Sequence, residues 1–388
     1  MNRSSVSAAS PLDCHLFGPG PKRILALDGG GVRGIVALAF LKRIEETLAA
    51  EAGHAVRLCD YFDLIGGTST GAIIAVALTL GYNVDQIHDF YLQLAPKVFR
   101  PPRLKLPGVT PKFDARALTR ELDGVIGDRH LDSADLQTGL GVMLKRMDTA
   151  SAWILTNNPR SVFWETPPDH SFIGNRHYRL AQIVRASTAA PHYFKPQEIE
   201  IARGVDGMFV DGGLTPHNNP SLELFLTAVL PGYRLNWETG PEKLTIVSVG
   251  AGSFRDKTDD PHSLQKGMAA KLALRAMVQL IAENQQLILT VMSFLGESPT
   301  PWEIDSQVGV IGMIPPPGGP MFRFLRYDIR LEADWFQQEL AVAVGPEQIA
   351  QMRHFDDATA MPLLDELSAK AAKRQVLAEH WRRPVAAA

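Results

Sequence analysis

Short apolar runs that end in glycine-rich turns and lead into amphipathic segments dominate the first 80 residues. Residues 23–27 form an apolar run of buried-strand length, which stops at a glycine-rich turn over residues 28–34. Apolar residues then recur at helical spacing over residues 35–48, and a second run, turn and small-residue segment follows at residues 61–80. Two such units predict an α/β fold, with a mostly parallel sheet covered by helices.

Weaker periodicity continues along the remaining chain. Helices are expected at residues 84–94 (ended by Pro96), 114–126 and 178–188, one long helix or two at 263–295, and mostly helical structure at 346–381. Strands are expected at residues 141–144, 152–156, 208–210, 244–249 and 322–331. The N-terminal residues mix Ser, Ala, Pro and Gly without a period. We therefore expect three parts: a flexible N-terminal arm at 1–21, a folded domain at 22–230, and a largely helical C-terminal extension at 231–388 that packs on this domain.

Composition narrows the classes of partner. The chain has 388 residues, 21% of them charged, and a formal net charge of −3, so no global field attracts nucleic acid or an anionic membrane. Any contact with lipid must therefore be local, and no nucleic-acid partner is expected. Cys14 and Cys59 cannot form a disulfide framework and suit a reducing compartment. With no apolar segment typical of a signal peptide or membrane span, a cytoplasmic location is expected.

The second turn holds a serine in the pattern G-x-S-x-G. Its residues are Gly67, Thr68, Ser69, Thr70 and Gly71. The glycines and the small residues that follow allow the backbone to turn sharply between strand and helix, which is the arrangement of a nucleophile elbow. The hydroxyl would then lie at a helix N-terminus, where the dipole favours developing negative charge. The pattern predicts a serine placed to attack carbonyl carbon.

The first turn admits two interpretations. Residues 29–34 match the spacing G-x-G-x-x-G of dinucleotide-binding loops, although a lone match is weak. In a nucleotide site, Asp28 would place a carboxylate beside the pyrophosphate. The consecutive glycines Gly29, Gly30 and Gly31 instead allow several N–H groups to converge on one point, and Arg33 adds positive charge. This favours an oxyanion hole, with nucleotide binding as the alternative.

A serine hydroxyl needs a base, and Asp211 is the candidate. It follows a short apolar run and precedes Gly212 and Gly213, although Asp-Gly is also the commonest turn dipeptide. A conventional triad would require a histidine after the acid. Neither His192 nor His217 has a position that argues for this role. The simpler assignment is a two-residue arrangement of the serine and this aspartate.

The segment between residues 90 and 113 contains no acidic residue. Its basic side chains are Lys97, Arg100, Arg103, Lys105 and Lys112, with apolar residues and prolines among them. A loop with this mixture is suited to contact lipid head groups and acyl chains. A solvated loop that is merely basic is the alternative.

The three motifs at residues 28–34, 67–71 and 211–213 together resemble the patatin-like phospholipase family, as do the segments 186–191 and 218–220. The likeness spans residues 22–226. It implies that residues 22–230 form a doubly wound catalytic domain with helices on both faces of the sheet and a Ser–Asp dyad, acylated by lipid esters without metal or other cofactor. By position, Ser69 is the nucleophile, Asp211 the base, and the N–H groups around Gly30 and Gly31 form the oxyanion hole beside Arg33.

The expected function is that of a serine acyl hydrolase of the phospholipase A or lysophospholipase type, working through an acyl-enzyme with peripheral contact at a membrane. Two other functions compete with it. One is a nucleotide-dependent enzyme that uses the glycine loop. The other is a non-catalytic lipid- or partner-binding module that keeps the serine turn as architecture.

Overall fold

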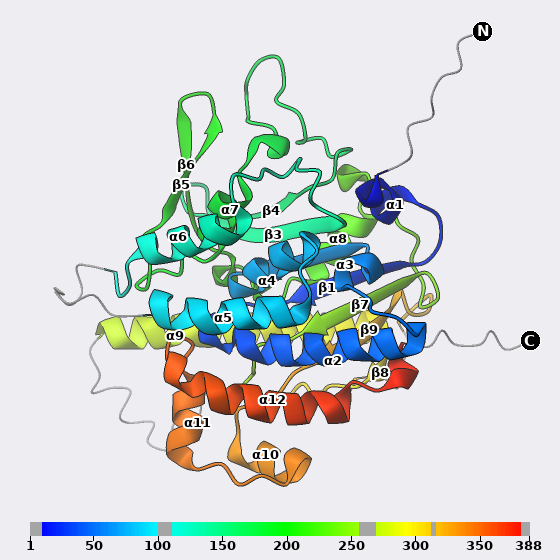
Figure 1. The fold of residues 1–388 in the computed structure, drawn as a ribbon, viewed down its shortest axis with the longest axis vertical. Helices are drawn as coiled ribbons and strands as arrows, with labels where there is room; N and C mark the ends of the chain where they lie inside the picture. Colours follow the sequence, from blue (N-terminus) through cyan, green and yellow to red (C-terminus); the bar gives the residue numbers. More distant parts are fainter. Residues whose placement is uncertain (1–9, 100–110, 256–268, 312–315, 382–388) are drawn as a thin grey trace, which may run out of the picture.

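The computed structural model describes residues 10–99, 111–255, 269–311 and 316–381. Within these residues, nine strands form one sheet, in the order β5-β6-β3-β2-β1-β7-β9-β8, with β4 pairing with β3 (Figure 1). β4 and β6 run antiparallel to β3, β5 runs antiparallel to β6, and the other pairs are parallel. The strands are β1 (Lys22–Leu27), β2 (Leu64–Thr68), β3 (Gly139–Arg146), β4 (Ser151–Thr156), β5 (Gln197–Ala202), β6 (Val205–Asp211), β7 (Leu244–Val249), β8 (Gly296–Thr300) and β9 (Phe322–Tyr327).

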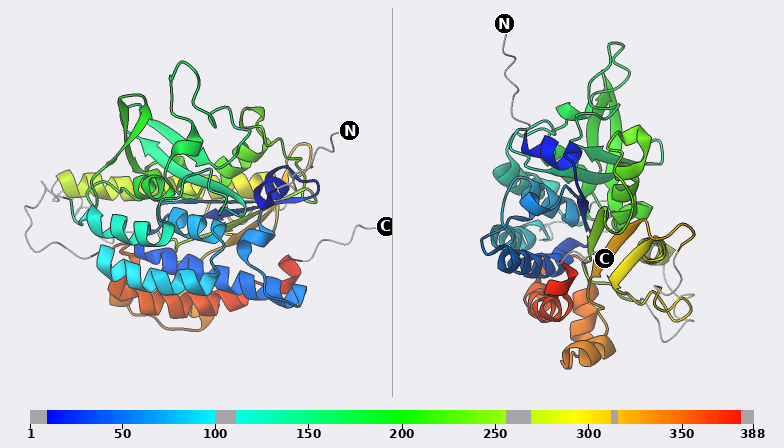
Figure 2. Two further views of the ribbon diagram at one scale, coloured as in Figure 1. Left: turned by 45° about the horizontal axis from the view of Figure 1, so that its top comes forward. Right: turned by 90° about the vertical axis from the view of Figure 1, so that its right-hand side faces the viewer.

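Helices cover both faces of the sheet, which confirms the predicted fold class. In the right-hand view of Figure 2, the blue, cyan and red helices lie on one side of the sheet and the yellow helix lies on the other. The helices are α1 (Pro11–Phe17), α2 (Gly34–Ala52), α3 (Leu58–Tyr61), α4 (Thr70–Thr79), α5 (Val84–Val98), α6 (Ala115–Ile126), α7 (Leu180–Ser187), α8 (Ser221–Val229), α9 (Ala269–Leu295), α10 (Ala333–Leu340), α11 (Pro346–Arg353) and α12 (Met361–Gln375).

Alternate residues of the central strands enter two separate apolar cores. On β1, Leu25 and Leu27 belong to the core that includes α2 and α4, whereas Ile24 and Ala26 belong to the core that includes α8 and α9. This is the period of two expected for a strand covered on both faces. Each fully buried leucine contributes about 1.5–3 kcal/mol relative to an exposed one.

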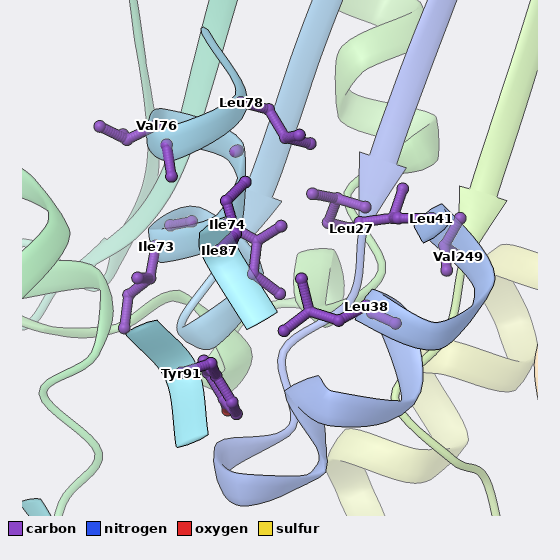
Figure 3. Close-up of a cluster of buried hydrophobic side chains, with 14 of the residues drawn as sticks. Leu27, Leu38, Leu41, Ile73, Ile74, Val76, Leu78, Ile87, Tyr91 and Val249 are labelled. Atoms are coloured by element: carbon purple, nitrogen blue, oxygen red, sulfur yellow. The ribbon is translucent and has the colours of Figure 1, made fainter. Parts of the chain in front are cut away.

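The first core holds α4 in place. Figure 3 shows Leu27, at the end of β1, between Ile74 of α4 and Leu41 of α2, with Val249, at the end of β7, beside Leu41. All ten residues of α4 are buried, so this helix is fixed from every side. Its N-cap residue is Ser69. Packing in this core therefore determines where the serine turn lies.

Two local expectations are wrong. Residues 1–21 were expected to form a flexible arm, but α1 occupies part of this stretch, capped by Ser10, with Leu16 buried. The carbonyl of Leu16 accepts a hydrogen bond of 2.8 Å from Trp237 Nε1, which ties the helix to the domain. The other error concerns α5, which continues past Pro96 because the turn that contains the proline still packs on the core.

Residues after 230 contribute strands to the central sheet as well as helices. β7 pairs with β1 in parallel along its whole length, and β9 pairs with the opposite edge of β7. Strands from both sides of the predicted boundary at residue 230 therefore share one sheet. Of the C-terminal helices, α9 packs on β8 and β9, α12 packs on α2, and α10 packs on α12. In the described parts of the chain, none of the helices combines the length and the hydropathy that crossing a membrane requires.

Candidate active site

Ser69 occupies the sharp turn between β2 and α4. Its backbone angles are φ 55° and ψ −123°, which a residue other than glycine seldom adopts. Two hydrogen bonds hold the turn, because the Ser69 N–H donates to Ser187 Oγ at 2.9 Å and the Ser187 hydroxyl donates to Met143 O at 2.6 Å. Strain of this kind persists only where the surrounding structure imposes it, and it is common at functional sites.

The two glycines of this turn are required by close packing. A Cβ atom at Gly67 would overlap the backbone of Gly71, and one at Gly71 would overlap the carbonyl of Leu27. Thr68 anchors the end of β2, because its hydroxyl donates to His217 O at 2.6 Å. The sequence pattern G-x-S-x-G therefore reflects how tightly β2, α4 and β1 approach one another.

Asp211, the last residue of β6, meets the serine directly. Ser69 Oγ donates a hydrogen bond of 2.6 Å to Asp211 Oδ2, and the Gly213 N–H donates to Asp211 Oδ1 at 2.8 Å. Gly212 has no room for a side chain, since a Cβ there would overlap Met143 O. The structure thus brings together two residues 142 positions apart.

Burial changes the acidity of this aspartate. Only 6% of Asp211 is exposed, and desolvation raises its pKa from 3.8 to about 6. The hydrogen bonds from Ser69 and Gly213, and the positive charge of Arg185, oppose this shift. Asp211 is therefore a stronger base than an ordinary carboxylate, yet it is ionised at neutral pH.

The glycine loop between β1 and α2 lies next to the serine. The Gly29 N–H donates to Asn218 O at 3.1 Å, and the Gly30 N–H donates to Thr70 Oγ1 at 3.2 Å. Gly31 adopts φ 59°, a left-handed conformation that glycine accommodates. The Gly31 N–H has no acceptor among the described residues, so this donor is available to a ligand.

A residue from the C-terminal region closes over this loop. The Val32 N–H donates to Phe355 O at 2.7 Å, and a Cβ at Gly31 would overlap the same carbonyl oxygen. The Tyr91 hydroxyl donates to Gly31 O from the other side. The loop is therefore held by α5 and by the segment that follows α11, and sequence motifs alone did not indicate either contact.

Arg33 supports the loop through its side chain. Its Nε donates to Gly30 O at 3.4 Å, and Nη1 donates to Gly252 O at 3.2 Å. The guanidinium carbon lies 5.3 Å from the ring centroid of Phe254. Burial lowers the pKa of Arg33 to about 10, so the group stays charged at neutral pH.

Asp28, directly before the glycine loop, belongs to a buried ion cluster. Arg326 Nη2 donates to Asp28 Oδ2 and to Asp328 Oδ2, both at 2.8 Å. Gln285 Nε2 of α9 also donates to Asp28 Oδ2 at 2.8 Å. Burial raises the pKa of Asp28 to about 6 in spite of the arginine. Sequence reasoning missed Arg326, because no local pattern connects it to a residue 298 positions away.

Two cavities meet at the serine. The larger one, of about 210 Å³, is lined by Ser69, Asp211, the glycine loop and apolar residues of α9 that include Ile281 and Leu289. The smaller one, of about 60 Å³, also reaches the serine and the aspartate, and its other walls are mainly apolar side chains. These walls include Ile73, Tyr91, Leu94, Val98, Phe99, Leu118 and Phe194. An apolar chain and a more polar group could thus lie on different sides of the serine.

His192 and His217 contact residues other than Ser69 and Asp211. His217 Nε2 lies 3.7 Å from Glu223 Oε2, and burial lowers its pKa. The ring of His192 packs edge-on against Tyr193. Among the described residues, no group of three or more His, Cys, Asp or Glu side chains is arranged to hold a metal ion.

The basic segment is described only at its ends. Arg100, Arg103 and Lys105 lie outside the described residues, so the hypothesis of lipid contact by them stays a prediction. Lys97 Nζ lies 2.9 Å from Glu121 Oε2, and Lys112 pairs with Asp356. The two described lysines therefore have carboxylate partners.

Comparison with known proteins gives a consistent assignment. The model of the family described as patatin-like phospholipase matches residues 25–225. A cGAMP-activated phospholipase of Escherichia coli (strain TW11681) is 27% identical over 277 residues, covering 70% of this chain and 72% of that protein. A cUMP-AMP-activated phospholipase of Escherichia coli is 30% identical over 266 residues, covering 68% and 74%. Patatin-like protein 1 of Arabidopsis thaliana is 30% identical over 269 residues, covering 63% and 61%.

A solved structure supports the fold. Human GIVD cytosolic phospholipase A2 superposes with a TM-score of 0.50 at 11% sequence identity, covering 93% of this chain and 60% of that one. At this identity the likeness concerns the fold alone. The family model, by contrast, covers just over half of the chain, and it includes the serine turn, the glycine loop and the aspartate. This chain therefore belongs to the patatin-like phospholipase family and is a lipid acyl hydrolase.

Proposed function

We propose that the protein hydrolyses acyl esters of phospholipids through a dyad of Ser69 and Asp211. Ser69 Oγ attacks the ester carbonyl carbon while its proton passes to Asp211 Oδ2. The tetrahedral intermediate collapses, the bond to the alcohol breaks, and the departing oxygen takes the proton back from Asp211. Water then attacks the acyl-enzyme, again with Asp211 as base, and releases the fatty acid and free serine.

The observation that carries this proposal is the 2.6 Å hydrogen bond between the serine hydroxyl and the aspartate, in a cavity that opens at the serine. A general base must lie within hydrogen-bond reach of the proton that it accepts, and its pKa should be close to the working pH. Asp211 meets both conditions, because burial raises its pKa to about 6.

The glycine loop supports the oxyanion in this scheme. We assign the role to the N–H groups of Gly31 and Gly30. The Gly31 donor has no acceptor among the described residues, and the Gly30 donor makes only a long bond of 3.2 Å to Thr70 Oγ1. Two aligned donors stabilise developing negative charge on the carbonyl oxygen. A nucleotide-binding role for the loop is disfavoured, because Asp28 is buried in an ion cluster and the Gly29 N–H is already bonded.

The test is chemical labelling combined with turnover. A fluorophosphonate should modify the wild-type protein, and Ser69→Ala should abolish both labelling and ester hydrolysis while the protein stays folded. Ser253→Ala is a matched control, because Ser253 lines the same cavity but its hydroxyl donates to Ile329 O. Retained hydrolysis in Ser69→Ala would refute the dyad and would leave the non-catalytic serine turn as the better interpretation.

We also propose that a cyclic dinucleotide activates the enzyme. The support is that two of the relatives described above are named as activated by cGAMP or cUMP-AMP and are similar over about 70% of this chain, more than the family region alone. Phospholipid hydrolysis should be measured with and without each cyclic dinucleotide. Equal rates in all conditions would contradict activation and would leave the dyad unaffected.

A further inference from the structure

The arginines that line the large cavity fall into two kinds. Arg255 and Arg330 share a carboxylate, because Arg255 Nη2 lies 4.0 Å and Arg330 Nη1 lies 3.4 Å from the side chain of Glu303. Arg33 and Arg353 have no carboxylate within 4.0 Å in the part of the chain that is described. The cavity thus contains two arginines that share a carboxylate and two that make no ion pair within 4.0 Å in the described residues, although the charge of Asp328 acts on Arg33 from a greater distance.

The two unpaired guanidinium groups surround one aromatic ring. The guanidinium carbons of Arg33 and Arg353 lie 5.3 and 5.2 Å from the ring centroid of Phe254. Stacking on an aromatic face keeps a guanidinium plane oriented while its N–H groups remain free at the edge. Both positive charges line the same cavity, and a nearby positive charge favours a bound anion.

Backbone contacts fix both side chains in this position. Arg353 Nε donates to Leu331 O at 3.0 Å, and Arg33 uses Nε and Nη1 on the carbonyls of Gly30 and Gly252. Their remaining N–H groups have no acceptor among the described residues. Both side chains line the cavity that contains Ser69. The donors are therefore available to a group bound in front of the serine.

We propose that Arg353, together with Arg33, binds the phosphate group of the lipid and so selects phospholipids over uncharged acyl esters. This inference rests on the proposed function. In a glycerophospholipid the phosphate is only a few bonds from the scissile ester, so one cavity holds both groups. Guanidinium forks match phosphate oxygens in shape and charge. Arg353 lies in α11, outside the region matched by the family model, so the family motifs do not include it.

The experiment compares two substrates that differ only in the charged headgroup. Kinetics on dihexanoylphosphatidylglycerol and on dihexanoylglycerol are measured for the wild type, Arg353→Gln, Arg353→Lys and Arg330→Gln. For Arg353→Gln we expect kcat/KM on the phospholipid to fall by about 10- to 100-fold, mainly through KM, which is the scale of one hydrogen bond to a charged group. The rate on the uncharged lipid should not change. Arg353→Lys should recover part of the loss.

Arg330→Gln is the matched control, since it removes an arginine of the same cavity that is already paired. We expect its preference for the phospholipid to equal that of the wild type. If Arg330→Gln lowered the preference as much as Arg353→Gln, the net charge of the cavity would set selectivity and the assignment to Arg353 would be wrong. An equal loss on both substrates in Arg353→Gln would show a structural role and would also overturn it.

A further arm identifies the source of the phosphate. Inorganic phosphate and glycerol 3-phosphate are added as inhibitors of dihexanoylglycerol hydrolysis. We expect weak competition in the wild type and none in Arg353→Gln. If they competed while the two lipids reacted equally well, the site would bind a free phosphate compound, and the headgroup assignment would be refuted. Fluorophosphonate labelling of every variant reports separately on the dyad: failure to label the wild type would refute the proposed function itself.

Discussion

The acidity of Asp211 leads to a prediction for the pH dependence of hydrolysis. In the dyad mechanism the carboxylate accepts the serine proton, so only molecules with ionised Asp211 react. Because burial raises the pKa of Asp211 to about 6, we expect kcat/KM to rise with pH through a midpoint near 6. An exposed aspartate would place this midpoint near its ordinary value of 3.8.

The size of the effect distinguishes these cases. At pH 5, a group with a pKa of about 6 is ionised in about one tenth of the molecules, so kcat/KM should be about tenfold lower than at pH 8. A group with a pKa of 3.8 would be more than nine-tenths ionised at pH 5, and the rate would hardly change. Replacing Arg185, whose positive charge lowers the pKa of Asp211, by Met should move the midpoint to higher pH.

The same pKa has a consequence for stability. A carboxyl whose pKa is higher in the folded state than in the unfolded state contributes stability that is fully present below about pH 4 and is lost as the pH rises through about 6. Asp211→Asn removes this dependence. Above pH 6, the variant should be more stable than the wild type by up to about 3 kcal/mol, at about 1.4 kcal/mol per pH unit. Below pH 4, the difference should vanish.

Two measurements check this reasoning. Fatty acid released from a short-chain phospholipid is quantified by chromatography between pH 4.5 and 8, while circular dichroism verifies that the protein stays folded. Urea unfolding of the wild type and of Asp211→Asn is followed at pH 4 and pH 7. A rate profile that is flat between pH 7 and 5, or an Asn variant that is less stable at pH 7, would refute the account of Asp211 as a buried, ionised base. The same variant should lose about 10²-fold or more in rate.

Three further substitutions test other parts of the site. Gly31→Ala should lower kcat by about 10²-fold or more if the Gly31 N–H stabilises the oxyanion. Gly53→Ala is its control, because Gly53 also has a left-handed backbone but open space around it, and this variant should lower only the melting temperature. Equal activity in the two variants would contradict the role of Gly31. Arg326→Met leaves two buried carboxylates unpaired and should lower the free energy of unfolding in urea by about 3–5 kcal/mol, so a change below about 1 kcal/mol would mean that the cluster is not a stabilising unit. His217→Gln should keep most of the esterase activity, whereas a loss as large as that of Asp211→Asn would indicate a triad.

Much of the fold could be predicted because its signals are local. The strand at residues 22–27 and the glycine turn after it are adjacent in sequence, and so are β2, the serine turn and α4. The order of the strands in the sheet has no such local signal. β1 lies between β2 and β7, and β7 begins more than 200 residues after β1. The short helix α1 could not be predicted for another reason. It has only seven residues, too few to show a helical period, and its contacts with the rest of the domain stabilise it.

In the site, too, the local turns could be predicted and the long-range contacts could not. Glycine patterns indicated Ser69 and the loop at residues 29–31 because these turns restrict which residues fit. The pairing of Ser69 with Asp211 was predicted from chemistry and from the resemblance, and the structure places the two side chains in contact. The supports supplied by Arg326, Gln285 and Phe355 could not be predicted, because each comes from a region without a motif and contacts the loop only in the folded chain.

The hydrogen bond between the Val32 N–H and Phe355 O determines when, during synthesis, the active site becomes complete. A chain emerging from the ribosome completes the serine turn, the glycine loop and Asp211 long before residue 355 appears. Contacts between distant parts of a chain form late, so the loop lacks this support until residue 355 has been made. We expect nascent chains to react with a fluorophosphonate only after residue 355 has left the ribosome, and labelling of shorter stalled chains would contradict this. Lipid hydrolysis would then begin only once the segment that contains Phe355 has left the ribosome and packed on the glycine loop.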